Sequence, residues 1–214
     1  MSEITVCCIK WGWKFGPQYV NHLYSGVKRN IRRHRFDFVC FTDDPTGIHP
    51  GIRTERPLCG YPRQWGKLGL FKPAIPEIQT DRFLYFDLAC VIVGDLDPVI
   101  DMTADFAICR DWPPEMRPHD GSYASGAFML RVGSRPEGWE RFDMRNRTTW
   151  GDQLWIYRNA PGATLFPYDW SPSYKLRKLQ TACPPGAKWI MFHGRPKPHE
   201  CNGWVSEAWP GEPK

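Results

Sequence analysis

Two short apolar runs near the start of the chain, separated by an amphipathic segment, constrain the fold more than any other feature. Residues 4–9 (ITVCCI) and 36–41 (FDFVCF) have the length and residue types of buried strands, and the apolar spacing across 18–31 predicts a helix. A strand, a helix and a second strand in that order predict a parallel pair joined by a right-handed crossover. The chain therefore begins as an α/β fold.

The rest of the chain adds elements of the same kind. They are strands within 82–93 and at 106–109 and 124–132, and helices at 66–72, 138–145 and 152–159. Asp97 before Pro98 is a candidate N-cap of a further helix. Because no repeat and no break in composition divides the 214 residues, we predict one domain over 1–214. Its expected architecture is a central mixed, mostly parallel sheet flanked by helices.

Composition excludes several classes of protein. No apolar run reaches the roughly 18 residues that a membrane span requires, so no integral membrane segment is expected. The first residues lack the apolar stretch and cleavage site of a signal peptide. The eight cysteines include no C-x-x-C pair, which argues against a disulfide framework or a zinc site. We therefore expect a reducing, cytoplasmic compartment.

The charge of the chain favours an anionic ligand. Its 28 basic and 23 acidic side chains give a net charge of +5, which suits a phosphate-bearing ligand, an anionic surface or nucleic acid without choosing among them. The densest basic run, KRNIRRHR at 28–35, is either the solvated end of the predicted helix or a patch that docks a polyanion.

The most informative segment is RFLYFDLACVIVGDLDP, at 82–98. Its apolar run places Asp87 at the carboxyl end of a strand, where open α/β sheets bind ligands. A carboxylate is costly to bury there unless it meets a cation, a basic group or a sugar hydroxyl. The alternative is that Asp87 caps its own turn.

This segment resembles the metal-binding turn of GT-A glycosyltransferases, and most closely that of family eight and its bacterial and phage relatives, whose pattern is roughly YLDxDVVVxGDLxxL. Tyr85, Asp87, Val91 and the run 94–96 (GDL) are in register with that pattern. The resemblance implies a Rossmann-like GT-A domain that binds a nucleotide-diphosphate sugar. It also implies a divalent metal, Mn²⁺ or Mg²⁺, held by both carboxylates of an Asp-x-Asp turn.

The second of those carboxylates is replaced by Ala89 in this chain. A methyl group cannot bind a hard cation, so the metal is expected to be weakened or absent. The replacement is a natural loss, a metal-independent variant or an engineered, inactivating change. Asp95 and Asp97 have the spacing of an Asp-x-Asp motif displaced along the chain, although the family has a structural turn at that point.

The earlier segments resemble the family's nucleotide site. The loop that carries Trp11 resembles the part that holds the base and ribose, although its aromatic rings are equally suited to core packing. Asp43 resembles an acidic nucleotide contact and is otherwise a turn residue. Lys67 matches the basic residue of the family's "Kl-lf" helix, with Arg63 beside it, and would neutralise the diphosphate; the alternative is a surface lysine.

Two central segments resemble the sugar site. YASGAFMLRV, at 123–132, resembles the strand "fNSGvmlI", which implies that Ser125 and Gly126 contact the donor sugar, with Ala124 in place of the usual Asn. Asp152 and Gln153 match the family's "DQ" pair beside the anomeric carbon and the acceptor, which makes them the candidate catalytic residues. Asp152 is otherwise a helix N-cap.

The late segment WIMFHGRPKPHE, at 189–200, resembles the family's HFxGxxKPW motif. Gly194 and Lys197 align and would approach and neutralise a phosphate. The family's metal-binding histidine falls at Met191, while this chain offers His193, two positions later. The resemblance makes Asp87 and His193 the two remaining metal ligands, with a structural histidine as the alternative.

Together these segments predict a glycosyltransferase that uses a nucleotide-diphosphate sugar, in the family's manner a UDP-sugar with retention of configuration. Saccharides are the family's usual acceptors, and a basic, Trp-rich chain also permits a modified base in DNA. Because Ala89 replaces a metal ligand, turnover is expected to be low. The rival hypothesis is a GT-A scaffold that binds nucleotide or glycan without catalysis.

Overall fold

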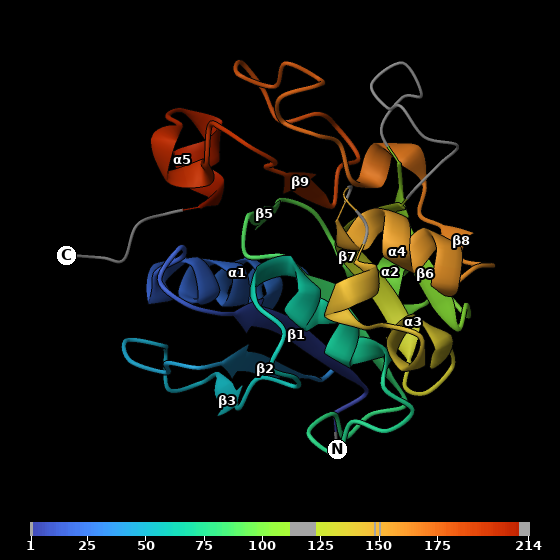
Figure 1. The fold of residues 1–214 in the computed structure, drawn as a ribbon. Coiled ribbons are helices and arrows are strands. Elements are labelled where there is room, and N and C mark those ends of the chain that lie inside the picture. Colours follow the sequence, from blue (N-terminus) through green and yellow to red (C-terminus); the bar gives the residue numbers. More distant parts are fainter. Residues whose placement is uncertain (1, 112–122, 148, 150, 210–214) are drawn as a thin grey trace.

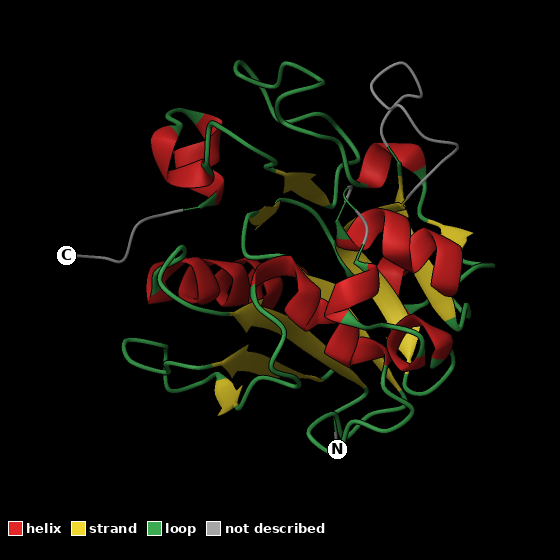
Figure 2. Cartoon of the chain, in the orientation of Figure 1, coloured by secondary structure: helices red, strands yellow, loops and turns green. Residues whose placement is uncertain are grey.

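The computed structural model describes residues 2–111, 123–147, 149 and 151–209. In these residues seven strands form one sheet in the order β3-β2-β1-β4-β7-β6-β8, and β5 and β9 form a small second sheet (Figures 1 and 2). The strands are β1 Ile4–Lys10, β2 Phe36–Thr42, β3 Arg53–Glu55, β4 Arg82–Phe86, β5 Cys90–Ile92, β6 Phe106–Arg110, β7 Tyr123–Arg131, β8 Thr164–Leu165 and β9 Trp189–Met191.

Helices of two kinds surround these strands. The α-helices are α1 Pro17–Asn30, α2 Asp97–Ile100, α3 Glu137–Glu140, α4 Asp152–Asn159 and α5 Trp204–Ala208. Tighter 3₁₀ segments are η1 Arg63–Phe71, η3 Met144–Asn146, η4 Tyr168–Trp170 and η5 Pro198–Glu200. Within the described residues, none of these helices has the length and apolar character needed to cross a bilayer.

The predicted β–α–β start is confirmed. β1 and β2 are parallel, with Ile4 beside Phe36 and Lys10 beside Thr42, and α1 makes the connection between them. α1 begins at Pro17, whose fixed φ angle suits a first helical position. β1 is also parallel to β4, so β4 lies in the middle of the sheet.

The sheet is mixed and mostly parallel, as predicted. The pairs β3–β2, β2–β1, β1–β4 and β6–β8 are parallel, whereas β7 is antiparallel to both β4 and β6. Because β7 runs the opposite way, its first residues lie beside the carboxyl end of β4, with Ala127 opposite Phe86. This reversal brings Ser125 and Gly126 to the place where the chain turns at Asp87.

The run 82–93 contains two strands, β4 and β5, separated by a turn at Asp87. β4 ends at Phe86, and a turn closed by the bond from Cys90 N to Asp87 O leads into β5, which pairs antiparallel with β9 in the second sheet. A carboxylate side chain is costly to bury within a sheet that is covered on both faces, and the strand ends before Asp87. The break places Asp87 between the two sheets.

Both faces of the large sheet are buried. On one face the core includes the apolar side of α1, the small sheet and α5, with Val6 and Leu84 among the strand residues. On the other face Cys7, Phe83 and Phe128 pack against η1 and α4. Successive strand residues point to opposite faces, which explains why the strand sequences are apolar without alternation. Figure 1 shows α1 apart from the group formed by α3 and α4.

Three helix predictions need correction. The segment predicted at 66–72 lies mostly within a longer 3₁₀ helix, η1. The segment predicted at 138–145 contains the short helix α3 and then a turn. After that turn η3 begins, with the Asp143 side chain as its N-cap, which accepts a hydrogen bond from Arg145 N.

Asp97 is the first residue of α2 and not its N-cap. Its carboxylate, almost fully buried, accepts bonds from the backbone N–H groups of Arg32 and Arg33 instead. Asp97 is therefore committed to the fold and is not part of a displaced metal motif.

The basic run 28–35 is partly neutralised within the molecule. Arg33 pairs with Asp101 at 2.5 Å, and His34 lies between Asp101 at 3.0 Å and Glu3 at 2.9 Å. The run begins in the last turn of α1, as the helix-end interpretation requires. All eight cysteines are free thiols in the structure.

Gly94 gives a stability prediction, because its backbone is pressed against another segment. A Cβ at this position would lie 2.2 Å from the carbonyl oxygen of Ala187, and Gly94 N is bonded to Lys188 O. Backbone cannot move aside as a flexible side chain can, so Gly94→Ala is expected to lower the free energy of unfolding by about 1–3 kcal/mol. Denaturant titration measures this loss. Gly60→Ala is the control, since a Cβ there meets nothing within 4 Å; equal losses in both variants would contradict the close approach.

Candidate active site

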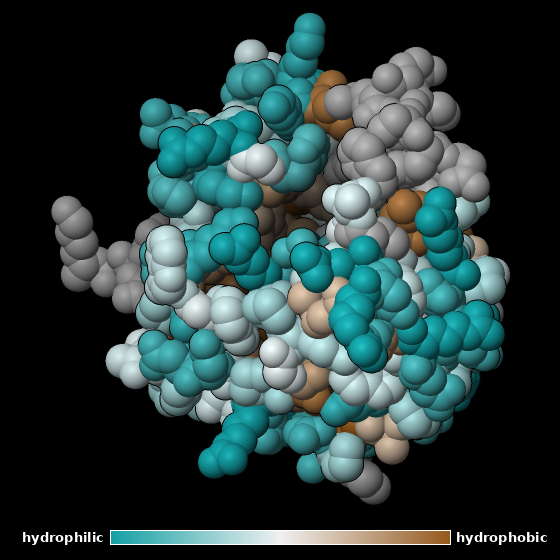
Figure 3. Space-filling view, viewed as in Figure 1, coloured by the Kyte–Doolittle hydropathy of each residue, from teal (hydrophilic) through white to brown (hydrophobic). Residues whose placement is uncertain are grey.

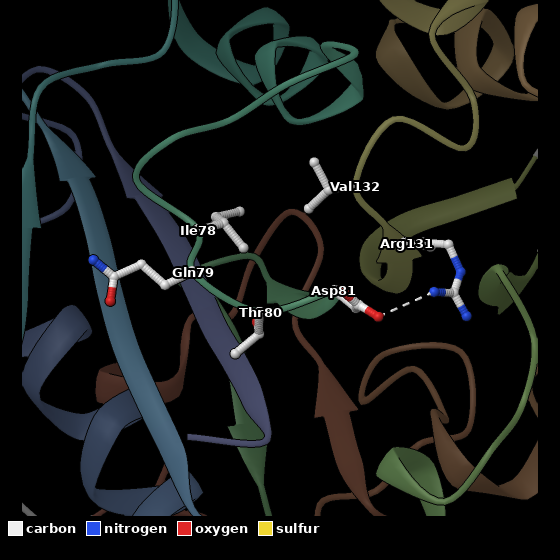
Figure 4. A pocket seen from close by; sticks show the side chains of 6 residues that line it. All are labelled: Ile78, Gln79, Thr80, Asp81, Arg131 and Val132. Atoms are coloured by element: carbon white, nitrogen blue, oxygen red, sulfur yellow. Dashed lines mark hydrogen bonds and ion pairs between the residues drawn. The ribbon is translucent and has the colours of Figure 1, made fainter. Parts of the chain in front are cut away.

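One surface cavity carries no catalytic arrangement. It encloses about 370 Å³ beside the start of β4 and the end of β7, lined by Ile78, Gln79, Thr80, Asp81, Arg131 and Val132 (Figure 4). Its charged groups, Asp81 and Arg131, form an exposed pair at 3.4 Å. An exposed pair of this kind is an ordinary surface feature.

The second cavity lies at the opposite, carboxyl end of β4, where sheets of this type bind ligands. It encloses about 80 Å³ and is lined by Asp87, Ala89, Cys90, Gly126, Gln153, Met191, Phe192 and His193. These residues come from β5, β7, α4, β9 and the turns beside them. Figure 3 shows a hollow in the middle of the face, between the part that carries β9 and α5 and the part that carries α1 and η1. We treat this cavity as the candidate site.

A buried lysine stands at its centre. Lys67, on η1, places its Nζ 3.0 Å from Asp87 Oδ1, 3.1 Å from Asp152 Oδ2 and 3.0 Å from the carbonyl oxygen of Ser125. Its side chain is 4% exposed. Lys67 therefore joins two carboxylates from distant parts of the chain, and the surface-lysine alternative is wrong.

The charges of this group determine its protonation. Burial alone would lower the pKa of Lys67, but the carboxylates of Asp152 and Asp87 outweigh burial and hold the pKa above its usual value. The Tyr85 hydroxyl donates to Asp87 Oδ1, and burial together with that carboxylate raises the pKa of the phenol well above its usual value. At neutral pH the group thus contains an ammonium ion and a neutral phenol.

Ser125 and Gly126, both predicted site residues, are adjacent to this group. Ser125 Oγ donates to Asp152 Oδ2 at 2.5 Å, and the carbonyl of Gly126 accepts from Asp87 N at 2.7 Å. A Cβ on Gly126 would lie 3.1 Å from the sulfur of Met191. A side chain at position 126 would therefore press on Met191, another residue that lines the cavity.

Asp152 and Gln153 occupy the first turn of α4, as predicted. The N-cap is Gly151, with φ at +80°, so the N-cap alternative for Asp152 is wrong. The Asp152 side chain is buried and turned toward Lys67, while Gln153 lines the cavity. One helical turn thus contributes a fixed carboxylate and a neighbouring amide at the cavity.

The residues expected to contact the nucleotide lie at the ends of β1 and β2. The carboxylate of Asp43 accepts from Gly12 N through both oxygens, at 3.0 and 3.1 Å, which fixes the loop that carries Trp11. Trp11 is 40% exposed, so it is not a core residue. Arg63 begins η1, is exposed, and is not among the residues that line the cavity.

The late motif reaches the cavity from β9. His193 Nε2 is 2.7 Å from Ser173 Oγ, and its pKa is lowered by burial first and then by the charges of Lys175 and Lys197. Lys197 Nζ donates to the carbonyl of Phe192, a cavity residue, at 3.4 Å. Gly194 has φ at +68°, a left-handed angle that a turn at this point requires.

These side chains do not fit a divalent metal. The described residues contain no group of three or more His, Cys, Asp or Glu side chains placed to hold an ion. Asp87 and His193 line one cavity, but Lys67 lies 3.0 and 3.2 Å from the two carboxylate oxygens of Asp87, and Ala89 supplies only a methyl group. Mn²⁺ and Mg²⁺ need several oxygen or nitrogen ligands, and an ammonium ion already holds the strongest one here.

Two site residues were not predicted as such. Tyr85 is two positions before Asp87 on the same strand, so the two-residue period of a strand could have identified it as a neighbour on one side. Ser173, which contacts His193, carries no signal in the sequence, because its position depends on how the loop after η4 folds back beside β9.

No protein-family profile matches the chain, and no curated protein is significantly similar in sequence. Solved structures match over almost its whole length. An active-site mutant of LgtC superposes with a TM-score of 0.69 at 13% identity, covering 98% of both chains. The galactosyltransferase LgtC in complex with donor and acceptor sugar analogues gives 0.64 at 13% identity, again over 98% of both.

The glycosyltransferase GlyE of Streptococcus pneumoniae gives a TM-score of 0.65 at 11% identity, over 98% of this chain and 60% of GlyE. These likenesses concern the fold. They confirm the prediction of an α/β architecture of the GT-A type.

Proposed function

We propose that this protein is a glycosyltransferase that moves a sugar from a nucleotide-diphosphate sugar, in the first place a UDP-sugar, to an acceptor hydroxyl with retention of configuration. The fold is that of LgtC, GlyE and other glycosyltransferases. The complex of LgtC with donor and acceptor sugar analogues supports a nucleotide sugar and a saccharide as the substrate classes. A modified DNA base stays a second acceptor class because the chain carries a net charge of +5.

The observation that carries this proposal is the group formed by Lys67, Asp87, Asp152 and Ser125. A buried ammonium ion that bridges two carboxylates is expensive to assemble, and the same residues packed as apolar side chains would often stabilise a fold as well or better. Charged groups of this kind concentrate at catalytic sites. The group also lies beside the cavity at the carboxyl end of β4.

The reaction divides among the residues as follows. The bond between the anomeric carbon and the diphosphate oxygen breaks, and a bond from the acceptor oxygen to that carbon forms. The hydroxyl proton of the acceptor leaves with the diphosphate. Asp152, fixed by Lys67 and Ser125, places negative charge where the sugar ring becomes positive, and Gln153 orients the sugar and the acceptor by hydrogen bonds. Lys197 neutralises the departing diphosphate.

Mass spectrometry of donor turnover tests the proposal. The chain is incubated with a panel of nucleotide-diphosphate sugars, without acceptor and with saccharide or modified-DNA acceptors, and the release of nucleoside diphosphate is measured. We expect slow release from at least one donor and at least a tenfold loss in Asp152→Asn, since removal of one transition-state contact typically costs a factor of 10² or more. Asp81→Asn, in the other cavity, is the control variant and should retain turnover.

The rival function is a GT-A scaffold that binds a nucleotide or glycan without turnover, and Ala89 is the feature that favours it. Nucleotide binding by calorimetry with no release from any donor in the panel would establish the rival. Failure to bind any nucleoside diphosphate or nucleotide sugar would contradict both functions.

A further inference from the structure

We propose that the donor's diphosphate is bound without a divalent metal, by the ammonium groups of Lys14, Lys175 and Lys197 at the rim of the cavity between Asp87 and His193. This inference rests on the proposed transferase function. It assigns to Lys14 and Lys175 a role in donor binding, and it follows from an arrangement of positive charge on three separate segments.

The first observation is a single aromatic ring that carries two ammonium groups. Lys14 Nζ lies 5.3 Å and Lys197 Nζ 5.6 Å from the centre of the Phe15 ring. Each distance is within the range of a cation–π interaction. Phe15 itself packs edge-to-face on Tyr19 at 4.7 Å, at the start of α1, which holds the ring in place. The loop after β1 and the loop after β9 thus present their lysines side by side.

The second observation is that these lysines lack carboxylate partners. Across the described parts of the chain, Lys14, Lys175 and Lys197 form no ion pair with Asp or Glu, whereas Lys67 forms two. The pKa of Lys197 is lowered by burial first and by the charge of Lys14 second. The charges of Asp87 and Glu200 offset part of this effect. The like charge that remains costs free energy, and a bound anion removes that cost.

The third observation places the lysines at the cavity. Lys197 donates to the carbonyl of Phe192, which lines the cavity beside His193. Lys175 follows Ser173 by two residues, and Ser173 Oγ lies 2.7 Å from His193 Nε2. The charge of Lys175 also contributes to lowering the pKa of that imidazole. The positive charge therefore lies on the β9 side of the cavity, across from the Lys67 group.

Three ammonium groups can replace a divalent cation in this role. Cations aimed at a leaving group stabilise the negative charge that develops on it, whether they come from a metal or from side chains. Lys67 is not available for this purpose, because its charge is already compensated by Asp87 and Asp152. The loss of a metal ligand at Ala89 and the presence of lysines without ion pairs thus have one explanation, which is that lysine side chains bind the diphosphate in place of a metal.

Calorimetry on the full chain tests the inference, with UDP, GDP, ADP and TDP as probes and the matching nucleosides for comparison. Each titration is done in EDTA and again with millimolar MnCl₂. We expect the preferred diphosphate to bind equally well in both buffers, within about twofold. Lys14→Gln and Lys197→Gln should each weaken diphosphate binding about tenfold, the range expected for a lost charged contact, without changing nucleoside binding.

Lys175→Gln is also expected to weaken diphosphate binding without changing nucleoside binding. Lys28→Gln is the matched control, because it removes the same charge from an exposed position near the other end of α1. Thermal melts verify that every variant is folded. Binding that requires MnCl₂, or EDTA-insensitive binding that none of the three site variants weakens, would overturn the inference while the transferase function stands. Absence of any diphosphate or nucleotide-sugar binding in both buffers would instead overturn the proposed function.

Discussion

Replacing Lys67 with methionine is expected to destabilise the protein by about 3–5 kcal/mol and to abolish donor turnover, because the change leaves two buried or half-buried carboxylates without their shared cation. Methionine has a similar unbranched shape, so the loss is electrostatic rather than a loss of packing. Asp87 and Asp152 would then repel each other, and Ser125 would lose a bond to its carbonyl. Urea titration gives the stability, and release of nucleoside diphosphate gives the turnover.

A second change in the same background keeps this prediction testable. Adding Asp152→Asn to Lys67→Met removes one of the repelling charges, so the double variant should recover part of the lost stability while it stays inactive. The double-mutant cycle then measures the coupling between the two side chains. Lys28→Met, at an exposed position, is the control and should leave the unfolding midpoint unchanged. If Lys67→Met were as stable as the starting protein, the ion-paired group would not be part of the folded structure in solution.

Changing Ala89 to aspartate is expected to create a metal-stimulated enzyme. Ala89 lines the same cavity as Asp87 and His193, and its backbone is fixed by the bond from Phe192 N to Ala89 O. A carboxylate at this position would add an oxygen ligand beside the His193 imidazole, and Mn²⁺ would then compete with Lys67 for the carboxylate of Asp87. We expect turnover of Ala89→Asp with millimolar MnCl₂ to exceed that of the starting protein at least tenfold, and EDTA to remove the gain.

Ala89→Asn is the matched control for this gain, since it has nearly the same shape without the charge. It should show no stimulation by MnCl₂. The starting protein should be slow and indifferent to EDTA. Equal behaviour of the two variants, or strong stimulation of the starting protein by MnCl₂, would contradict the interpretation of position 89.

The sequence predicted those parts of the site whose placement depends on local patterns. An apolar run that ends in a carboxylate places Asp87 at a strand end, and helical spacing places Asp152 and Gln153 in the first turn of α4, a helix whose predicted and observed bounds agree. Asp97 shows the limit of this reasoning. Its position before a proline predicted a helix N-cap. In the structure its carboxylate instead accepts hydrogen bonds from the backbone N–H groups of Arg32 and Arg33, which are distant in the sequence.

The amino-acid sequence by itself determined the α/β class, the parallel start of the sheet and the strand end that carries Asp87, because short apolar runs mark buried strands and a three- and four-residue apolar spacing marks a helix. Only the tertiary structure decided that β7 runs antiparallel beside β4, that Lys67 joins Asp87 to Asp152, and that Lys14 and Lys197 meet at Phe15. These contacts depend on strand order and on loops that fold back from distant positions. Local sequence patterns carry no information on such pairings, because each of these residues would fit its own strand, helix or loop equally well whichever distant residue it contacted.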